Sequence, residues 1–214
     1  MAKIIYFFIS KIMKVFSIVN WEWLKFKITG RRFNLRLEDL ITVSEYLAKD
    51  YYLILTRKDA HLSTFMINLG HFLKTGQWGF WSHILMNVDN SVDDVNKFLF
   101  CEATGTGVHT SKLMDVLNCD AVCLLKLTKY TSEEFTECTD DYLDDLEKKY
   151  DCLFDMLDDK KMSCVEFVRD QIRHLNNYSE KMSRFEELVA RQKSITPDMF
   201  YSCPDFEVVL EIRR

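Results

Sequence analysis

One cysteine lies where a helix is expected to begin. Ser163 and Glu166 have the spacing of a capping box, in which the hydroxyl accepts from an N–H three residues later and the carboxylate accepts from the N-cap N–H. This pattern makes Ser163 the N-cap and Cys164 the first helical residue. The apolar residues that follow at helical spacing are Val165, Val168, Ile172 and Leu175.

A thiol at a helix start can be a nucleophile. The positive end of the helix dipole favours the thiolate of Cys164, and a nearby imidazole would complete the activation. The alternative interpretation is a small buried apolar residue, because free cysteines are commonly buried. The interpretation of Cys164 as a nucleophile therefore requires a histidine elsewhere in the sequence.

The histidine and its partner are expected on two consecutive strands. The segment Phe80–Val88 is rich in β-forming residues and predicts a strand with His83 near its start. The segment Lys97–Thr104 predicts a second strand, with Glu102 near its end. In adjacent antiparallel strands the carboxylate could bind one imidazole nitrogen and fix its tautomer. We therefore expect a catalytic triad of Cys164, His83 and Glu102.

Other histidines compete for the role of base. His109, beside the tight turn Gly105–Gly107, is the main alternative to His83. His61 and His71 are interpreted as surface or capping residues, because neither lies beside a matching motif. The turn itself is no dinucleotide-binding fingerprint, since the third glycine and the following helix spacing are absent.

The cysteines and acidic pairs do not form a metal-binding pattern. Cys119 and Cys123 are four apart, but no His/Cys pair follows at zinc-finger spacing. The pairs Asp140-Asp141 and Asp144-Asp145 lack the EF-hand spacing and its central glycine. We expect no metal and no cofactor. The seven cysteines are an odd, scattered set, which favours free thiols in the cytoplasm or another reducing compartment.

Five short segments, taken in order, resemble the circularly permuted papain-like cysteine hydrolases of the YiiX-like branch of the NlpC superfamily. They are Ser82-His83, Cys101–Val108, Tyr150–Phe154, Ser163–Val168 and Ile195–Phe200. In this branch the histidine precedes the cysteine, which opens a late helix. The resemblance runs from about Tyr51 to the C-terminus. It implies Cys164 as nucleophile, His83 as base and Glu102 as the polar third member.

The chain departs from the family pattern at two places. Tyr51–Thr56 stands where the family usually has a Gly-Asp-Ile strand, and Ser163 stands where it often has tyrosine. The resemblance implies a cysteine peptidase or amidase that acts on peptide, isopeptide or amide bonds. Related permuted folds, similar to lecithin–retinol acyltransferase, act on lipid acyl groups. A lipid acyl hydrolase or acyltransferase is therefore the enzymatic alternative, and an inactive interaction protein on the same scaffold is the other.

Composition and length favour a folded protein with a substantial core. The 214 residues are 48% hydrophobic and 14% aromatic, as expected for one domain with additions. The net charge is −5, with a basic N-terminal part and an acidic stretch from Glu133 to Asp159. The folded part shows no concentrated basic face, so we expect no nucleic-acid binding.

The first 27 residues predict an amphipathic helix with lysines in its polar face. Lys11 and Lys14 interrupt the apolar run before it reaches the roughly 20 residues of a membrane span, and no small-residue cleavage site follows. Two interpretations stay open. The helix packs on its own domain or on a second copy in a homo-oligomer, or it lies on an anionic membrane with Phe7, Phe8, Trp21 and Trp23 inserted.

The sequence thus predicts an α+β fold of the permuted papain-like type. Residues 1–49 form an N-terminal helical extension, and residues 50–214 form the catalytic domain. An antiparallel sheet or small barrel packs against the helix that begins at Cys164. Further strands are expected at 51–56, 120–128 and 206–212, and further helices at 35–49, 61–75, 110–117, 131–149 and 178–191. The aromatic segment Gln77–Trp81 is expected to line a substrate groove or to pack in the core.

Overall fold

The computed structural model describes residues 35–59, 62–90, 97–137, 141–146, 148–150, 161–192 and 195–214. The predicted amphipathic helix of residues 1–27 lies outside these ranges, as do His61, Cys138 and Cys152. Within these ranges, no helix combines the length and the apolar character that crossing a membrane requires.

The fold is built on a six-stranded antiparallel sheet with strand order β4-β3-β2-β1-β5-β8. Its strands are β1 (Leu53–Arg57), β2 (His83–Asp89), β3 (Leu99–Thr104), β4 (Gly107–Lys112), β5 (Ala121–Leu127) and β8 (Phe206–Arg213). Five of them occupy the predicted strand positions. A separate parallel pair is formed by β6 (Lys149–Tyr150) and β7 (Lys161–Met162).

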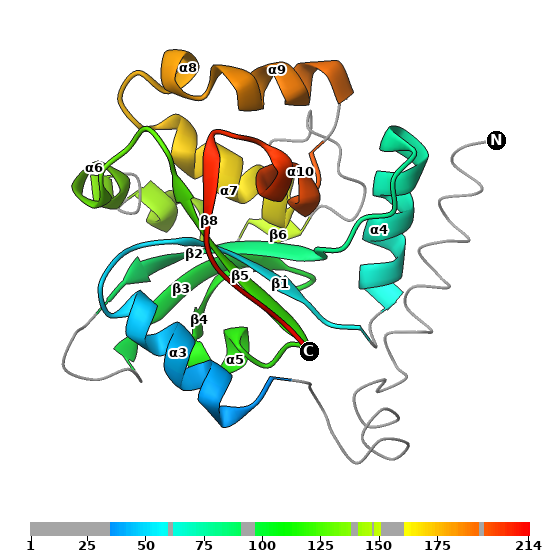
Figure 1. Cartoon of the computed structure of the whole chain (residues 1–214). Helices are drawn as coiled ribbons and strands as arrows, with labels where there is room; N and C mark the ends of the chain where they lie inside the picture. The colour runs from blue at the N-terminus through cyan, green and yellow to red at the C-terminus, as the bar shows by residue number, and fades with distance from the viewer. Residues whose placement is uncertain are drawn as a thin grey trace.

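Helices cover both faces of the sheet (Figure 1). One face carries α7 (Cys164–Arg173), and near it lie α8 (Tyr178–Lys181), α9 (Ser183–Gln192) and α10 (Pro197–Ser202). The other face carries α3 (Leu37–Leu47) and α5 (Leu113–Val116). The remaining helices are α4 (Leu62–Thr75), α6 (Ser132–Glu137) and the 3-10 helix η2 (Asp141–Asp145). This arrangement confirms the α+β prediction.

Strand β1 shows how the sequence fills both cores. Leu53 and Leu55 belong to the core beneath α7, whereas Ile54 belongs to the core beneath α3. Successive side chains of a strand point to opposite faces, so a continuous apolar run is what a strand covered on both sides requires. Val43 and Leu47 of α3 are fully buried in the second core, so this helix is an integral layer of the fold.

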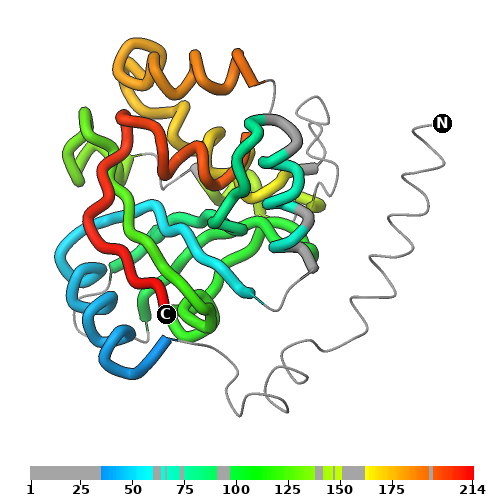
Figure 2. Tube along the Cα trace, turned by 45° about the vertical axis from the view of Figure 1, so that its right-hand side comes forward, coloured from blue at the N-terminus to red at the C-terminus, as the bar shows by residue number. Residues whose placement is uncertain are grey.

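The two ends of the described chain are tied together. Figure 2 shows the C-terminus close to α3, where the guanidinium of Arg214 lies 2.6 Å from an oxygen of Asp39. Burial alone would raise the pKa of Asp39, but the hydrogen bond from Arg214, the largest influence on the group, lowers it.

Three helix predictions are corrected by the structure. The segment 110–117 is the end of β4 followed by the short α5, because its first residues pair with β3. The acidic segment 131–149 is not one helix: α6 ends at Glu137 and η2 begins at Asp141. The predicted helix 178–191 is divided into α8 and α9.

Candidate active site

Helix α7 begins as the capping-box pattern predicts. Ser163 lies just before the helix with extended backbone, and its Oγ accepts from the N–H of Glu166 at 3.4 Å. In return, Oε2 of Glu166 accepts from the N–H of Ser163 at 2.8 Å. Cys164 is therefore fixed as the first residue of α7, where backbone N–H groups have no acceptor within the helix.

The sulfur of Cys164 lies in the interior. The residue has no exposed surface and packs in the core formed with Val165 and Val168. The described cysteines Cys101, Cys119, Cys123, Cys164 and Cys203 are all free and buried. Burial raises the pKa of the thiols of Cys101, Cys119 and Cys123 to about 12, so these three are neutral at pH 7. What distinguishes Cys164 is its neighbour, His83.

His83 is the first residue of β2 and contacts both predicted partners. Its Nε2 lies 2.7 Å from Oε2 of Glu102, and its side chain is 21% exposed. Burial alone would lower the pKa of the imidazole. The charge of Cys164, its hydrogen bond with the ring, and the hydrogen bond and charge of Glu102 outweigh burial and raise this pKa from 6.5 to about 10. The ring therefore lies between a sulfur and a carboxylate, and both favour its protonated form.

Glu102 is a charged residue in a buried place. Burial would raise the pKa of its carboxyl, but the hydrogen bonds and charges around it lower this pKa to about 2. The groups responsible are, in order, His83, Ser111 and His109. Ser111 donates its hydroxyl to Oε1, the oxygen that His83 does not use. Nε2 of His109 lies 3.7 Å from the same oxygen.

The structure thus brings together all three predicted site residues. His109, the alternative base, lies against Glu102, while it is His83 that interacts with Cys164. Ser111 was missed by sequence reasoning. Its position on β4, two residues after His109, could have indicated it, because alternate residues of a strand share one face.

His71 is not a surface residue as predicted. It is 7% exposed, and its Nδ1 lies 2.8 Å from Oγ1 of Thr196. This contact joins α4 to the segment that begins α10. His71 therefore has a structural partner in the described fold.

Asp198 of α10 binds the chain just before His83. Its Oδ1 accepts from the backbone N–H groups of Phe80 and Trp81, at 2.8 Å and 3.3 Å. A Cβ at Gly79 would lie 2.8 Å from Oδ2 of Asp198, so a larger residue there would have to push this carboxylate aside. The segment Ile195–Phe200, whose role the sequence left open, thereby holds the start of the strand that carries the imidazole.

The two tryptophans of the segment Gln77–Trp81 have different surroundings. Trp81 is fully buried, so core packing is correct for it. Trp78 is 52% exposed, and its ring lies 5.7 Å from that of Phe65 and 6.0 Å from that of Phe72, between centroids. Both phenylalanines are also exposed and belong to α4. These three rings, the α4 aromatic cluster, form an apolar patch on the surface.

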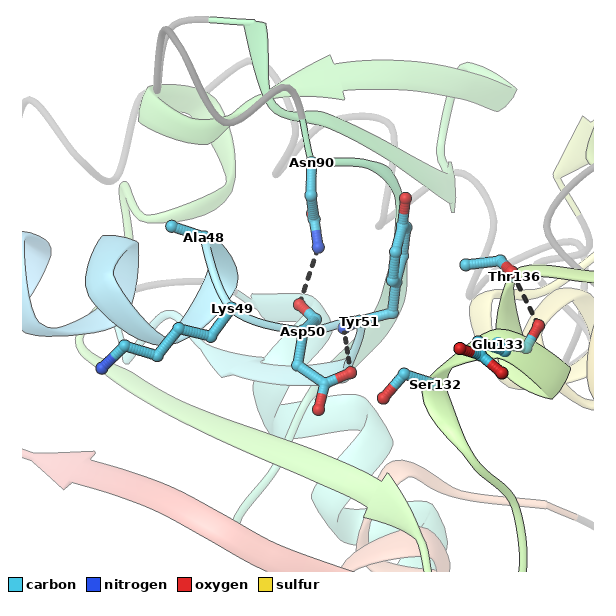
Figure 3. A pocket seen from close by; sticks show the side chains of 8 residues that line it. All are labelled: Ala48, Lys49, Asp50, Tyr51, Asn90, Ser132, Glu133 and Thr136. Atoms are coloured by element: carbon cyan, nitrogen blue, oxygen red, sulfur yellow. Dashed lines mark hydrogen bonds between the residues drawn. The ribbon is translucent and has the colours of Figure 1, made fainter.

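A surface depression of about 290 Å³ lies away from these residues (Figure 3). It is lined by Ala48, Lys49, Asp50, Tyr51, Asn90, Ser132, Glu133 and Thr136. Tyr51 precedes β1 and Asn90 follows β2, whereas His83 pairs with Thr56 near the other ends of these strands. The depression is therefore at the opposite end of the sheet from the imidazole. Its main carboxylate, Asp50, is already paired with Lys126.

Comparison with known proteins finds a similarity of fold and no match of sequence. No protein-family model matches the chain, and no curated protein matches its sequence. Among solved structures, it is similar to the crystal structure of the metalloprotein yiiX from Escherichia coli O157:H7, DUF1105, with a TM-score of 0.52 and 15% identity. The superposition covers 77% of this chain and 98% of yiiX. The chain therefore has a YiiX-like fold.

Proposed function

We propose that the chain is a thiol hydrolase that cleaves a peptide or amide bond through an acyl-enzyme. The observation that carries the proposal is the convergence of Cys164, His83 and Glu102 from α7, β2 and β3. A thiol beside an imidazole that is oriented by a carboxylate is the arrangement that nucleophilic catalysis by cysteine requires. The YiiX-like fold and the order of histidine before cysteine agree with the permuted papain-like hydrolases.

The first half of the reaction uses the ion pair. The Cys164 thiolate attacks the substrate carbonyl carbon, forming a C–S bond, and the carbonyl electrons move onto oxygen. In the proposed step, free N–H groups at the start of α7 stabilise this oxyanion. The imidazolium of His83 gives its proton to the leaving amine as the C–N bond breaks, which leaves a thioester on Cys164. Glu102 accepts a hydrogen bond from Nε2 and so keeps the other ring nitrogen directed at the reacting atoms.

The second half consumes water. The neutral imidazole of His83 takes a proton from a water molecule as its oxygen attacks the thioester carbonyl. The C–S bond then breaks and the carboxylic acid product leaves. The thiolate and the imidazolium are restored, so all atoms and charges balance over the cycle.

Burial of the sulfur sets a condition on this chemistry. Cys164 has no exposed surface, and the exposed member of the group is His83. A substrate carbonyl must therefore approach from the side of the imidazole and displace the atoms that cover the sulfur.

The similar protein yiiX is described as a metalloprotein, which raises the question of a metal here. In the part of the chain that the structure describes, no three or more His, Cys, Asp or Glu side chains are grouped so that they could hold a metal ion. Nε2 of His83 is occupied by Glu102. These donors do not fit a resident metal, and the proposal includes no metal step.

A second candidate is a lipid acyl substrate on the same nucleophile, and the α4 aromatic cluster favours it. Exposed Trp and Phe rings are typical of surfaces that insert at the boundary between water and lipid. The reaction would be the same, with an alcohol leaving in place of an amine. The two candidates share Cys164 and differ in what the surrounding surface binds.

The test is site-resolved alkylation by iodoacetamide at pH 7. Trypsin releases Cys164 in the peptide Met162–Arg169, which contains no other cysteine. We expect Cys164 to react at least about tenfold faster than Cys123, a buried thiol that has no imidazole partner among the described residues. Equal rates at the two positions, or an unchanged Cys164 rate in His83→Ala, would exclude the nucleophile.

Substrate class is then tested with paired assays. Parent and Cys164→Ala proteins are incubated with a peptide library and with anionic phospholipid vesicles. Release of new amino termini by the parent alone supports the peptidase, and release of fatty acid by the parent alone supports the lipid candidate. A double variant, Phe72→Ser with Trp78→Ser, tests the α4 aromatic cluster, and Val208→Ser at another exposed apolar residue is its control. Loss of the lipid activity in the double variant alone would assign lipid binding to the cluster.

A further inference from the structure

We infer that Ser111 is a positioning residue of this site, which acts on His83 by holding the carboxylate of Glu102. The inference rests on the proposed function and extends it to a residue that no catalytic pattern in the sequence identifies. Ser111 touches neither the sulfur nor the substrate carbonyl in this scheme. Its role is exerted through Glu102.

The two oxygens of Glu102 have separate partners. Oε2 receives the hydrogen bond from Nε2 of His83, and Oε1 receives the hydroxyl of Ser111. A carboxylate bound at one oxygen can rotate about its side-chain bonds, whereas one bound at both oxygens is held in one orientation. The direction in which Glu102 presents Oε2 to the imidazole therefore depends on Ser111.

The environment makes this hydrogen bond costly to lose. Glu102 is 9% exposed and Ser111 is 8% exposed, so water does not readily replace the hydroxyl. A buried carboxylate oxygen without a donor is strongly disfavoured, and the ionised form of Glu102 would be disfavoured with it. The carboxylate would then take a proton or turn toward another donor. Either change removes the charge or the direction that His83 needs.

The hairpin of β3 and β4 places the hydroxyl. His109 lies directly opposite Glu102, and Ser111 lies opposite Phe100. Ser111 is thus the diagonal neighbour of Glu102 on the same face, within reach of its longer side chain. This geometry is set by strand pairing and needs no loop to adopt a particular conformation.

His109 provides a matched comparison, because it approaches the same oxygen less closely. Its Nε2 is 3.7 Å from Oε1 of Glu102, its side chain is 39% exposed, and its Nδ1 lies 3.0 Å from the carbonyl oxygen of Gly107. Water can occupy its place when the ring is removed. A substitution at His109 therefore perturbs the surroundings of Glu102 without removing the buried hydrogen bond.

The experiment measures the pH dependence of Cys164 alkylation by iodoacetamide in the full chain. The proteins are the parent, Ser111→Ala, Ser111→Thr and His109→Gln, with thermal unfolding followed in parallel. We expect Ser111→Ala to lower the Cys164 rate at pH 6 by about tenfold, because the thiolate–imidazolium pair loses its orienting carboxylate. In Ser111→Ala, the acidic side of the profile of alkylation rate against pH should also move to higher pH. Ser111→Thr retains the hydroxyl and should stay within about twofold of the parent. His109→Gln removes only the more distant contact with Glu102 and should lower the rate by less than Ser111→Ala does.

The outcomes separate two failures. If Cys164 of the parent is no more reactive than Cys123, the proposed hydrolase is wrong. If the parent is reactive but Ser111→Ala keeps the parental rate and pH profile, the hydrolase stands and the role of Ser111 is wrong. An equal loss in His109→Gln would also overturn it, since any change near Glu102 would then have the same effect. If Ser111→Ala lowers the unfolding temperature but leaves the pH profile of Cys164 alkylation unchanged, the role of Ser111 is only structural.

Discussion

Nε2 of His83 lies 2.7 Å from Oε2 of Glu102, although neither residue belongs to a paired position between β2 and β3. In these strands Met86 pairs with Cys101 and Asn87 pairs with Phe100. The pairing ends before it reaches His83 and Glu102. The pair is therefore made by side chains at a place where backbone pairing between the two strands has ended. The same imidazole also interacts with Cys164 of α7.

The first prediction concerns the charge of His83. Replacing Cys164 by Ala removes the largest influence that raises the pKa of the imidazole, so this pKa should fall from about 10. Glu102→Gln should lower it too. NMR titration of the His83 ring protons in the parent and in both variants checks these two shifts. A His83 titration that is the same in all three proteins would contradict the proposed ion pair.

A second prediction links this charge to stability. The folded-state pKa of His83 lies above its ordinary value of 6.5, so protonation stabilises the folded protein. The contribution is complete below pH 6.5 and is lost as the pH rises through 10. We expect the stability advantage of the parent over His83→Gln to shrink by roughly 1–3 kcal/mol between pH 6.5 and pH 10, allowing for the partly exposed ring. Urea unfolding across this range measures it, and a constant difference would refute it.

The third prediction tests the helix start. Ser163→Ala removes the N-cap acceptor and should cost about 1 kcal/mol of unfolding free energy. It should also slow the alkylation of Cys164, because the first turn of α7 holds the thiol in place. Ser179→Ala in α8 is the matched control, since Ser179 is exposed and should change stability little. Chemical denaturation of the two variants gives the comparison, and equal costs would argue against the cap.

The fourth prediction concerns the turn that connects β3 to β4. Gly107 has φ of 109°, and a Cβ there would lie 2.4 Å from the carbonyl oxygen of Lys148. Gly107→Ala should therefore destabilise the fold by about 2–4 kcal/mol, by adding backbone strain and a clash with the segment before β6. Gly105→Ala, where nothing lies within 4 Å of the added atom, is the control. A calorimetric unfolding temperature that falls equally in both would reject this account.

The fifth prediction concerns a buried acid. Among the described residues, Oδ2 of Asp198 and Oδ1 of Asn68 find no hydrogen-bond partner. Both lie near Gly79, at 2.8 Å and 3.0 Å from the position that a Cβ on this glycine would take. Burial raises the pKa of Asp198, so its ionised form weakens the fold as the pH rises. Asp198→Asn keeps the acceptor for Phe80 and Trp81 and adds an N–H near the oxygen of Asn68.

We therefore expect Asp198→Asn to equal or exceed the parent in stability at pH 7, by up to about 1 kcal/mol, and Asp198→Ala to be less stable. The Asn variant should lose its advantage as the pH falls and Asp198 takes up a proton. Urea unfolding at pH 4 and pH 7 distinguishes this from a purely ionic role of Asp198. In a purely ionic role, Asp198→Asn would be as damaging as Asp198→Ala.

The sequence revealed the elements whose local signals are strong. The capping box of Ser163 and Glu166 placed the start of α7, because capping depends only on residues within one turn. Strands such as β1 and β5 were predictable from apolar runs bounded by polar residues. The contact between His83 and Glu102 was anticipated from consecutive strands and from resemblance to a family.

What the sequence could not reveal depends on long-range contacts. Ser111 carries no catalytic signature, and its value comes from the register of β3 against β4. Residues 110–112 were predicted to be helical because a short segment of mixed character has no distinct period, and strand pairing decided the matter. Full burial of Cys164 also follows from tertiary packing, since the segment around it is amphipathic and compatible with either a surface or a core position.

The parallel pair of β6 and β7 links two parts of the site that belong to different elements. Lys149 stands opposite Lys161, and Tyr150 stands opposite Met162, immediately before the cap of α7. The N–H of Val108 in β4 binds the carbonyl of Lys148, so this ribbon is also attached to the hairpin that carries Glu102. The ribbon of β6 and β7 therefore ties the start of α7, with Cys164, to the hairpin of β3 and β4, with Glu102, by a route outside the six-stranded sheet. A change in this ribbon would shift the nucleophile and the carboxylate relative to one another.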